Sequence, residues 1–284
     1  MTVIQAIILG VVQGLTEFMP ISSSAHLVII PWLFHWNDPG LAFDVAMHIG
    51  TLAALLWFFA ADWVRLVRAG IASIIERKVG NDPDRRLAWL LVIGTVPGVM
   101  AGMLGESKID ELFHQPDASH SPEAMIAMAF VIVLLGIALF VSERKAQHKR
   151  ELALISLKDA VLIGLAQALA IFPGVSRSGS TITAGLALGF QREAAARFSF
   201  LLAALIVAGA GFESLFSIYS ELKTGAMAQS ELVLFGVGFV AATVSGYLCI
   251  KFLLRYLQKN STAIFVYYRW SLAVLIVAIT LLRM

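Results

Sequence analysis

Long, nearly unbroken runs of apolar residues dominate the hydrophobic pattern of this chain. Six runs each contain about 20 mostly apolar residues, the length that an α-helix needs to cross the hydrocarbon core of a bilayer. They cover Phe43–Ala61, Leu87–Gly105, Ala124–Val141, Ala196–Phe216, Leu232–Leu254 and Ala263–Leu282. The pattern therefore predicts an all-α polytopic membrane protein with six transmembrane helices.

Two further apolar segments are interrupted before they reach this length. Val3–Phe18 is followed by Pro20 and a polar run before apolar residues resume at Leu27–Phe34. Ala153–Phe172 is followed by the sequence PGVSRSGST before Ile182–Phe190. Each segment predicts a re-entrant helical hairpin, in which a short helix enters the membrane, the chain turns, and a second helix returns.

The two interrupted segments are related in sequence. Ala6–Leu27 aligns with Ala160–Thr181 without a gap, at a constant spacing of 154 residues. Identical residues occupy the aligned positions Ala6/Ala160, Gly10/Gly164, Gln13/Gln167, Leu15/Leu169, Phe18/Phe172, Ser22/Ser176 and Ser24/Ser178. We interpret this match as an internal duplication within a single membrane domain, with repeats in residues 1–142 and 153–284.

Loops that are rich in Lys and Arg alternate along the chain with loops that contain few of them, as the positive-inside rule requires. None precedes Arg65, six lie in residues 62–86, one in 106–123 and four in 143–151. Three spans separate the two hairpins, so the second repeat is expected to be inverted relative to the first. This topology places the N-terminus and the first hairpin outside and brings the two hairpin tips together near the midplane.

Composition supports the assignment to membrane proteins. Hydrophobic residues make up 59% of the chain, charged residues 14%, and the mean hydropathy is +0.83, which excludes an ordinary soluble domain. The only cysteine, Cys249, allows neither an intrachain disulfide nor a multi-cysteine metal site. The N-terminus lacks the features of a cleaved signal peptide, so we expect it to belong to the mature protein.

The polar residues of the apolar segments gather in the two expected tips. The first tip contains Gln13, Glu17, Ser22, Ser23, Ser24 and His26, and the second contains Ser176, Arg177, Ser178, Ser180 and Thr181. A carboxylate and an arginine at membrane depth are unfavourable unless they are paired or line a polar cavity, which indicates a functional site. A Gly- and Ser-rich helix start with an arginine suits a phosphate or diphosphate group.

These motifs resemble the undecaprenyl-diphosphate phosphatases of the bacitracin-resistance type. The first family motif, an acidic pair before a Ser-rich turn and a His, reads here Gln13, Glu17, Ser22–Ser24 and His26. The second, PGxSRSxxT, is complete from Pro173 to Thr181, and the likeness continues through FDVAMHIGTLAALLWFF at Phe43–Phe59. The first acidic position is often Glu in the family and is Gln13 here, which departs from a site with two carboxylates.

The resemblance implies hydrolysis of undecaprenyl diphosphate to undecaprenyl phosphate and inorganic phosphate, which recycles the carrier lipid of cell-wall glycan synthesis. It also implies a bacterial cytoplasmic (inner) membrane location and a homodimer. The outward-facing first hairpin, which holds most of the candidate catalytic residues, favours a site toward the periplasm. A divalent cation, Mg²⁺ or Ca²⁺, is expected, whereas no organic cofactor and no nucleic-acid partner are expected.

Roles for the tip residues follow from phosphoryl transfer, which depends on positioning and on neutralising oxygen charge. Arg177 is expected to hold the phosphoryl group, and the other expected phosphate-binding residues are Ser22, Ser176, Ser178 and Thr181. Ser23 is the candidate nucleophile, with Glu17 either activating it or binding the cation, for which Gln13 is a weaker candidate ligand. His26 is expected to protonate the leaving group or to activate water.

Several assignments have alternatives at this stage. The nucleophile is either Ser23, His26 through a phosphohistidine, or water. Ser22 and Ser24 also fit a role as helix N-caps alone. Gln13 is equivalent to Gln167 in the repeat, so a structural bond across the pseudo-twofold axis is a second interpretation of Gln13.

Two further pairs of residues lie outside the two tips. Asp44 and His48 are four residues apart on one helix face and fit either a metal pair or a polar contact. His114 and His120 are expected to be solvated in an outer loop.

A secondary transporter or flippase of a lipid phosphate or another anion is the alternative function, because inverted repeats with broken helices are also a transporter architecture. The two copies differ, however, at the positions that carry chemistry. Where the first copy has Glu17, Ser23 and His26, the second has an isoleucine, an arginine and a serine. This division between acid, nucleophile and proton carrier on one side and a cation on the other favours an enzyme.

Overall fold

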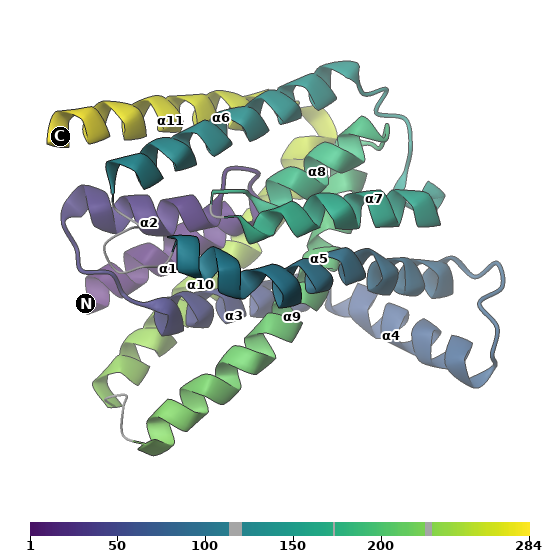
Figure 1. Ribbon diagram of the computed structural model, residues 1–284. Helices are drawn as coiled ribbons and strands as arrows, with labels where there is room; N and C mark the ends of the chain where they lie inside the picture. Colours follow the sequence, from purple (N-terminus) through teal and green to yellow (C-terminus); the bar gives the residue numbers. More distant parts are fainter. Residues whose placement is uncertain (114–120, 173, 225–228) are drawn as a thin grey trace.

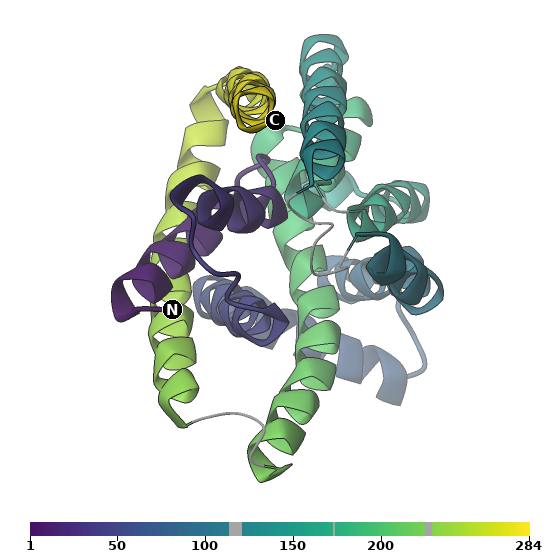
Figure 2. The same cartoon turned by 60° about the vertical axis from the view of Figure 1, so that its left-hand side comes forward.

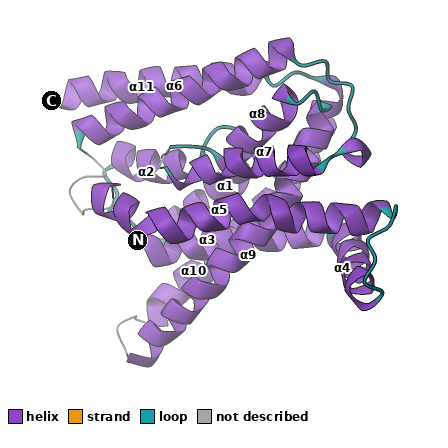
Figure 3. Ribbon diagram, turned by 45° about the vertical axis from the view of Figure 1, so that its right-hand side comes forward, coloured by secondary structure: helices purple, strands orange, loops and turns teal. Residues whose placement is uncertain are grey.

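The computed structural model describes the backbone of residues 1–113, 121–172, 174–224 and 229–284, and these residues are almost entirely helical (Figure 1, Figure 3). His114, His120 and Pro173 lie outside the described residues. The helices are α1 (Val3–Phe18), α2 (Ser23–Phe34), α3 (Leu41–Phe58), α4 (Ala60–Ile75), α5 (Pro83–Phe113), α6 (Pro122–Lys145), η1 (Leu152–Leu154), α7 (Leu157–Ala168), η2 (Leu169–Ile171), α8 (Arg177–Ala187), α9 (Arg192–Thr224), α10 (Gln229–Lys259) and α11 (Ala263–Arg283).

Five helices contain segments that are long and apolar enough to cross a membrane, as the hydropathy pattern predicts. These segments are Pro83–Leu104, Pro122–Lys145, Arg192–Gly211, Glu231–Lys259 and Ala263–Arg283. Each overlaps one of the expected spans, so the chain has the architecture of a multi-pass membrane protein.

The sixth expected span, Phe43–Ala61, is bent. Helix α3 ends at Phe58, and α4 continues after Phe59 at an angle of 81° to it. The prediction of a loop over residues 62–86 was therefore wrong for residues 62–75, which belong to α4, and for residues 83–86, where α5 begins. The residues of α4 show why. Its charged residues recur every three positions between aliphatic ones, which is the pattern of an amphipathic helix rather than of a loop.

The interruptions in the two short apolar segments occur where the sequence predicts them. Helix α1 ends at Phe18, before Pro20, and α2 begins at Ser23. In the second segment α7 ends at Ala168 and is followed by the short helix η2, and α8 begins at Arg177. Both returning helices have a serine N-cap, Ser22 for α2 and Ser176 for α8, which accepts a backbone N–H of the first turn.

Glycines bring each short helix into close contact with a long one. Helix α1 packs along α10, and α7 packs along α5 (Figure 2). A Cβ atom at Gly10 would lie 2.5 Å from the carbonyl oxygen of Gly238, and a Cβ atom at Gly164 would lie 2.2 Å from that of Gly94. Small residues at both positions are thus required for the backbones to approach.

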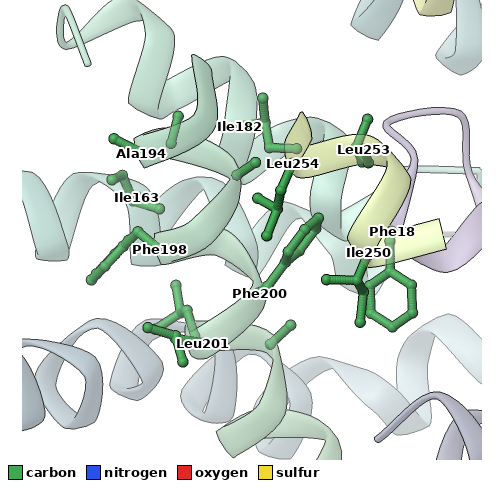
Figure 4. Packing of buried hydrophobic residues seen from close by; sticks show 14 of the residues in the cluster. Phe18, Ile163, Ile182, Ala194, Phe198, Phe200, Leu201, Ile250, Leu253 and Leu254 are labelled. Carbon is green, nitrogen blue, oxygen red and sulfur yellow. The ribbon is translucent and has the colours of Figure 1, made fainter. Parts of the chain in front are cut away.

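A buried aromatic and aliphatic cluster lies behind the end of α1. Phe18 meets Phe200 of α9 edge to face, with ring centroids 5.4 Å apart, and Ile250 and Leu253 of α10 belong to the same cluster (Figure 4). The cluster also includes Ile182 of α8. Because it contacts elements from both halves of the chain, it holds the end of α1 close to α8.

The close contact between α1 and α10 predicts that a methyl group at Gly14 destabilises the fold. A Cβ atom there would lie 2.0 Å from Ser245 Oγ and 2.6 Å from the carbonyl oxygen of Ala242. We expect Gly14→Ala to lower stability by about 1–3 kcal/mol, measured as a lower melting temperature in detergent. Gly236→Ala is the control, because no atom lies within 4 Å of the added carbon. Its melting temperature should not fall below that of the wild type. Equal melting of both variants would contradict this packing.

Candidate active site

The turn after α1 and the turn before α8 are in direct contact. Ser178 Oγ donates a hydrogen bond to the carbonyl oxygen of Met19 at 3.0 Å. Arg177 Nη2 forms a salt bridge with Glu17 Oε1. Residues about 160 positions apart in the chain thus meet as predicted for the two tips (Figure 1).

Glu17 is the centre of the polar contacts at this junction. Its Oε2 atom accepts hydrogen bonds from Ser23 Oγ at 2.6 Å and from Gln13 Nε2 at 3.0 Å, while its Oε1 atom faces Arg177. Only 8% of Glu17 is exposed. A buried carboxylate is stable only when its oxygens are bonded in this way, so candidate base, nucleophile and cation form one connected group.

Gln13 belongs to this group and does not reach across to the second repeat. Its amide nitrogen bonds Glu17, whereas the side-chain amide of Gln167 has no hydrogen-bond partner among the described residues. The structural interpretation of Gln13, a bond across the pseudo-twofold axis, is therefore wrong.

The first turn has an unusual backbone conformation at Ser22. This residue is fully buried and has a φ of 74°, a region that non-glycine residues seldom adopt. Its Oγ atom lies 3.3 Å from Ser24 Oγ and accepts the N–H of Ala25 at 3.4 Å. The hydroxyl of Ser22 thus caps α2. The positive φ of Ser22 turns the chain so that the hydroxyl of Ser23, rather than that of Ser22 or Ser24, contacts Glu17.

His26 points toward α11. Its Nδ1 atom lies 2.6 Å from the carbonyl oxygen of Ser22, and because a carbonyl only accepts, Nδ1 carries the proton. The unprotonated Nε2 of the neutral ring then accepts from the hydroxyl of Tyr268 at 2.6 Å, and the two rings are stacked at 5.7 Å. His26 is next to the site but makes no hydrogen bond to Ser23 or Glu17 among the described contacts.

The hydroxyl groups of the second tip divide between the junction and the helix behind it. Ser176 Oγ accepts the N–H of Gly179 at 3.0 Å and lies 3.2 Å from Ser178 Oγ, at the junction itself. Thr181 Oγ1 instead lies 2.6 Å from Ser199 Oγ of α9 and donates to the carbonyl oxygen of Arg177 at 2.8 Å. Thr181 therefore attaches α8 to α9, one turn behind Arg177.

Of the Asp44 and His48 pair, His48 reaches the site. Its Nε2 atom lies 3.6 Å from Glu17 Oε2, and its Nδ1 atom bonds the backbone oxygen of Asp44 at 2.8 Å. The carboxylate of Asp44 has a buried oxygen with no hydrogen-bond partner among the described residues. No group of three or more His, Cys, Asp or Glu side chains in the described part of the chain is arranged to hold a metal ion.

Two residues of α11 adjoin the site and were not identified from the sequence. Tyr268 bonds His26, and Arg269 Nε donates to the carbonyl oxygen of Pro20 in the first turn. Arg269 is a charged residue inside the apolar run Ala263–Leu282, so the rule that selected Glu17 and Arg177 also applies to it. Nothing in the sequence pattern indicates Tyr268.

The fold and this junction define a multi-pass membrane protein in which a buried carboxylate, a serine and an arginine meet between two broken apolar segments. Residues 6–275 match the family described as "Bacitracin resistance protein BacA", and the chain belongs to this family. The match confirms the resemblance of the two motifs.

Curated relatives cover nearly the whole chain. The chain is 46% identical over 279 residues to a protein of Thermomicrobium roseum named undecaprenyl-diphosphatase, with 98% of each chain covered. It is 44% identical over 283 residues to the protein of the same name from Moorella thermoacetica, with 100% of each covered. The protein of that name from Methanobrevibacter smithii is 42% identical over 287 residues, with 97% of each covered.

The contact between His26 and Tyr268 predicts a measurable tautomer. With ¹⁵N-labelled histidine in detergent micelles, we expect His26 to show a protonated Nδ1 and a hydrogen-bonded, unprotonated Nε2. Tyr268→Phe removes the donor and should shift the Nε2 resonance alone. The matched control is Tyr267→Phe, because Tyr267 is exposed and packs on Trp270. An Nε2 resonance unaffected by Tyr268→Phe would contradict the assigned bond.

Proposed function

We propose that this chain is an undecaprenyl-diphosphate phosphatase, which hydrolyses undecaprenyl diphosphate to undecaprenyl phosphate and inorganic phosphate. Family membership and the names of relatives 42–46% identical over nearly the whole chain support the reaction. The structural observation that carries the proposal is the contact of Ser23 with Glu17, whose other oxygen faces Arg177. Nucleophile, base and phosphate-binding cation are thereby adjacent.

We also propose the finer architecture of six spans and two re-entrant hairpins in inverted repeats. Two equivalent glycines support it, since Gly10 brings α1 onto α10 and Gly164 brings α7 onto α5. The distribution of Lys and Arg supports an outer first hairpin, and hence a site toward the periplasm of an inner membrane. A homodimer is proposed on the family resemblance alone.

Substrate binding begins at Arg177 in this proposal. In the structure the guanidinium of Arg177 is paired with Glu17. The terminal phosphate of the substrate displaces the Glu17 carboxylate and accepts hydrogen bonds from the planar guanidinium group of Arg177. It also accepts from the free backbone N–H groups at the start of α8, beside Ser176. Glu17 is thereby released from Arg177 while it keeps its bond to Ser23.

Ser23 then attacks the terminal phosphorus atom. Its proton passes to Glu17 Oε2, to which the hydroxyl already donates at 2.6 Å. The bond from the terminal phosphorus to the bridging oxygen breaks, and undecaprenyl phosphate leaves with that oxygen. Glu17 gives the proton that it has accepted to this leaving group. Water next attacks the phosphoserine and gives a proton to Glu17 as the bond from phosphorus to Ser23 Oγ breaks. That proton returns to Ser23 Oγ, and inorganic phosphate is released. Attack by His26 has less support, because Tyr268 already occupies its Nε2 atom.

The oxygen atoms around Glu17 fit a divalent cation. Glu17 offers its Oε1 atom, which the phosphate frees from Arg177, and Ser23 offers a hydroxyl. Gln13 offers a buried Oε1 atom with no hydrogen-bond partner among the described residues. Mg²⁺ and Ca²⁺ prefer such oxygen ligands. When bound, the ion would neutralise part of the diphosphate charge. The neutral amide of Gln13 is a weaker ligand than a second carboxylate.

The proposed reaction is tested by release of inorganic phosphate from undecaprenyl diphosphate by detergent-purified protein. We expect Glu17→Ala, Ser23→Ala and Arg177→Ala each to lower kcat by about 10³-fold or more, because each removes one part of the connected group. Ser24→Ala is the matched control, since Ser24 is exposed and makes no contact with Glu17. Turnover that survives Ser23→Ala would exclude the phosphoserine, and wild-type protein without turnover would favour a carrier.

The cation proposal predicts that a second carboxylate at the site strengthens cation binding. Chelation by EDTA should abolish turnover, and Mg²⁺ or Ca²⁺ should restore it. Gln13→Glu should lower the cation concentration needed for half-maximal rate by about tenfold, because it adds a charged oxygen ligand beside Glu17. Gln13→Ala is the comparison and should raise that concentration. Full turnover after chelation, or the same cation dependence in all three proteins, would contradict the site.

A further inference from the structure

Arg269 is the largest fully buried side chain among the described residues, with 0% exposed. Its single described hydrogen bond runs from Nε to the carbonyl oxygen of Pro20. Nη1 and Nη2 have no hydrogen-bond partner among the described residues. An enclosed guanidinium with four unbonded N–H groups is unfavourable in any apolar interior, so its position requires an explanation.

The guanidinium lies where both hairpin turns meet. Through Nε it contacts the first turn at Pro20. Its Nη2 atom lies over the first turn of α8, where a Cβ atom on Gly179 would be 2.3 Å away. The glycine of the SRSG sequence therefore leaves room for the arginine carried by α11. Both cations, Arg177 and Arg269, adjoin the start of α8.

The charges at this junction do not balance. Glu17 is the carboxylate that forms a salt bridge with Arg177, and no described salt bridge involves Arg269. The pair is neutral, so the junction retains the positive charge of Arg269. An anion with several oxygens would supply both the missing charge and acceptors for the two free Nη groups.

We propose that Arg269 is a second phosphate-binding residue of this site, whose Nη groups bond a phosphate of the lipid diphosphate while Arg177 holds the terminal phosphoryl group. The inference rests on the proposed function for the identity of the substrate. The Nη atoms of Arg269 are buried in the structure, and phosphate reaches them when it displaces Glu17 from Arg177 and the two turns separate. The energy lost by burying Arg269 is recovered when the anion binds.

A purely structural arginine would behave differently from a binding residue. If Arg269 serves only to hold Pro20, its replacement lowers the melting temperature of the ligand-free protein and leaves anion affinity unchanged. If Arg269 binds phosphate, replacing it by an apolar residue removes an unbalanced buried charge, so the ligand-free protein melts at the same temperature or higher and its anion affinity falls.

The experiment measures the dissociation constant of methylenediphosphonate, a diphosphate analogue without a cleavable bridge, together with the melting temperature in detergent. We expect Arg269→Met to raise the dissociation constant by at least about tenfold and Arg269→Lys to have an intermediate effect. Arg283→Met is the matched control, because Arg283 also lies on α11 and donates to backbone oxygens, here of Trp32 and Leu33. It should bind as the wild type does.

A dissociation constant for Arg269→Met within twofold of wild type would overturn the proposal. If that variant does not fold, Arg269→Lys decides, since unchanged affinity in a folded lysine variant would equally overturn it. Binding is measured without turnover, so the two hypotheses fail separately. Wild-type protein that binds the analogue through Arg269 but releases no phosphate would refute the reaction alone, whereas full turnover with unchanged affinity and KM in Arg269→Met would refute the role of Arg269 alone.

Discussion

The salt bridge between Glu17 and Arg177 is the interaction on which the rest of the structure depends. It joins two turns that are distant in the chain, and it does so between segments that are otherwise apolar. Removing either partner of such a buried pair leaves an uncompensated charge and typically lowers the free energy of unfolding by about 3–5 kcal/mol. The glycine contacts of α1 with α10 and of α7 with α5, and the aromatic cluster at Phe18, hold the two turns at this separation.

Around this pair the aligned segments Ala6–Leu27 and Ala160–Thr181 differ in the contacts that their residues make. The serine caps of α2 and α8 occupy equivalent positions and do equivalent work. The neighbouring residues do not: Ser23 reaches the carboxylate, whereas its counterpart, Arg177, provides the cation. The equivalent glutamines differ in the same way, because Gln13 bonds Glu17 and Gln167 has no partner among the described residues. The two aligned segments thus share their helix caps and differ in the residues that contact Glu17.

The sequence predicts the features that follow from the bilayer itself. Hydropathy predicts six spans, of which five match long apolar helices and the sixth is bent. Pro20 and the polar runs mark the breaks, and the unfavourable burial of charge selects Glu17 and Arg177. It does not identify α4, because a window long enough to find a span averages over an amphipathic helix. Nor does it show where His26 points, since Tyr268 is 242 residues away. Which hydroxyls cap helices and which face the site likewise depends on backbone angles such as the φ of Ser22.

The position of Glu17 on Arg177 has a consequence for selectivity. A carboxylate attached to the chain competes with every free anion for the arginine, at an effective concentration in the millimolar range or higher. Under the proposed function, a singly charged anion at ordinary levels would lose this competition, whereas a diphosphate that binds several donors at once would displace the carboxylate. After cleavage each product would carry less charge, and the carboxylate would return to Arg177. Glu17 would then act as an internal competitive inhibitor that excludes other anions and speeds the release of the products.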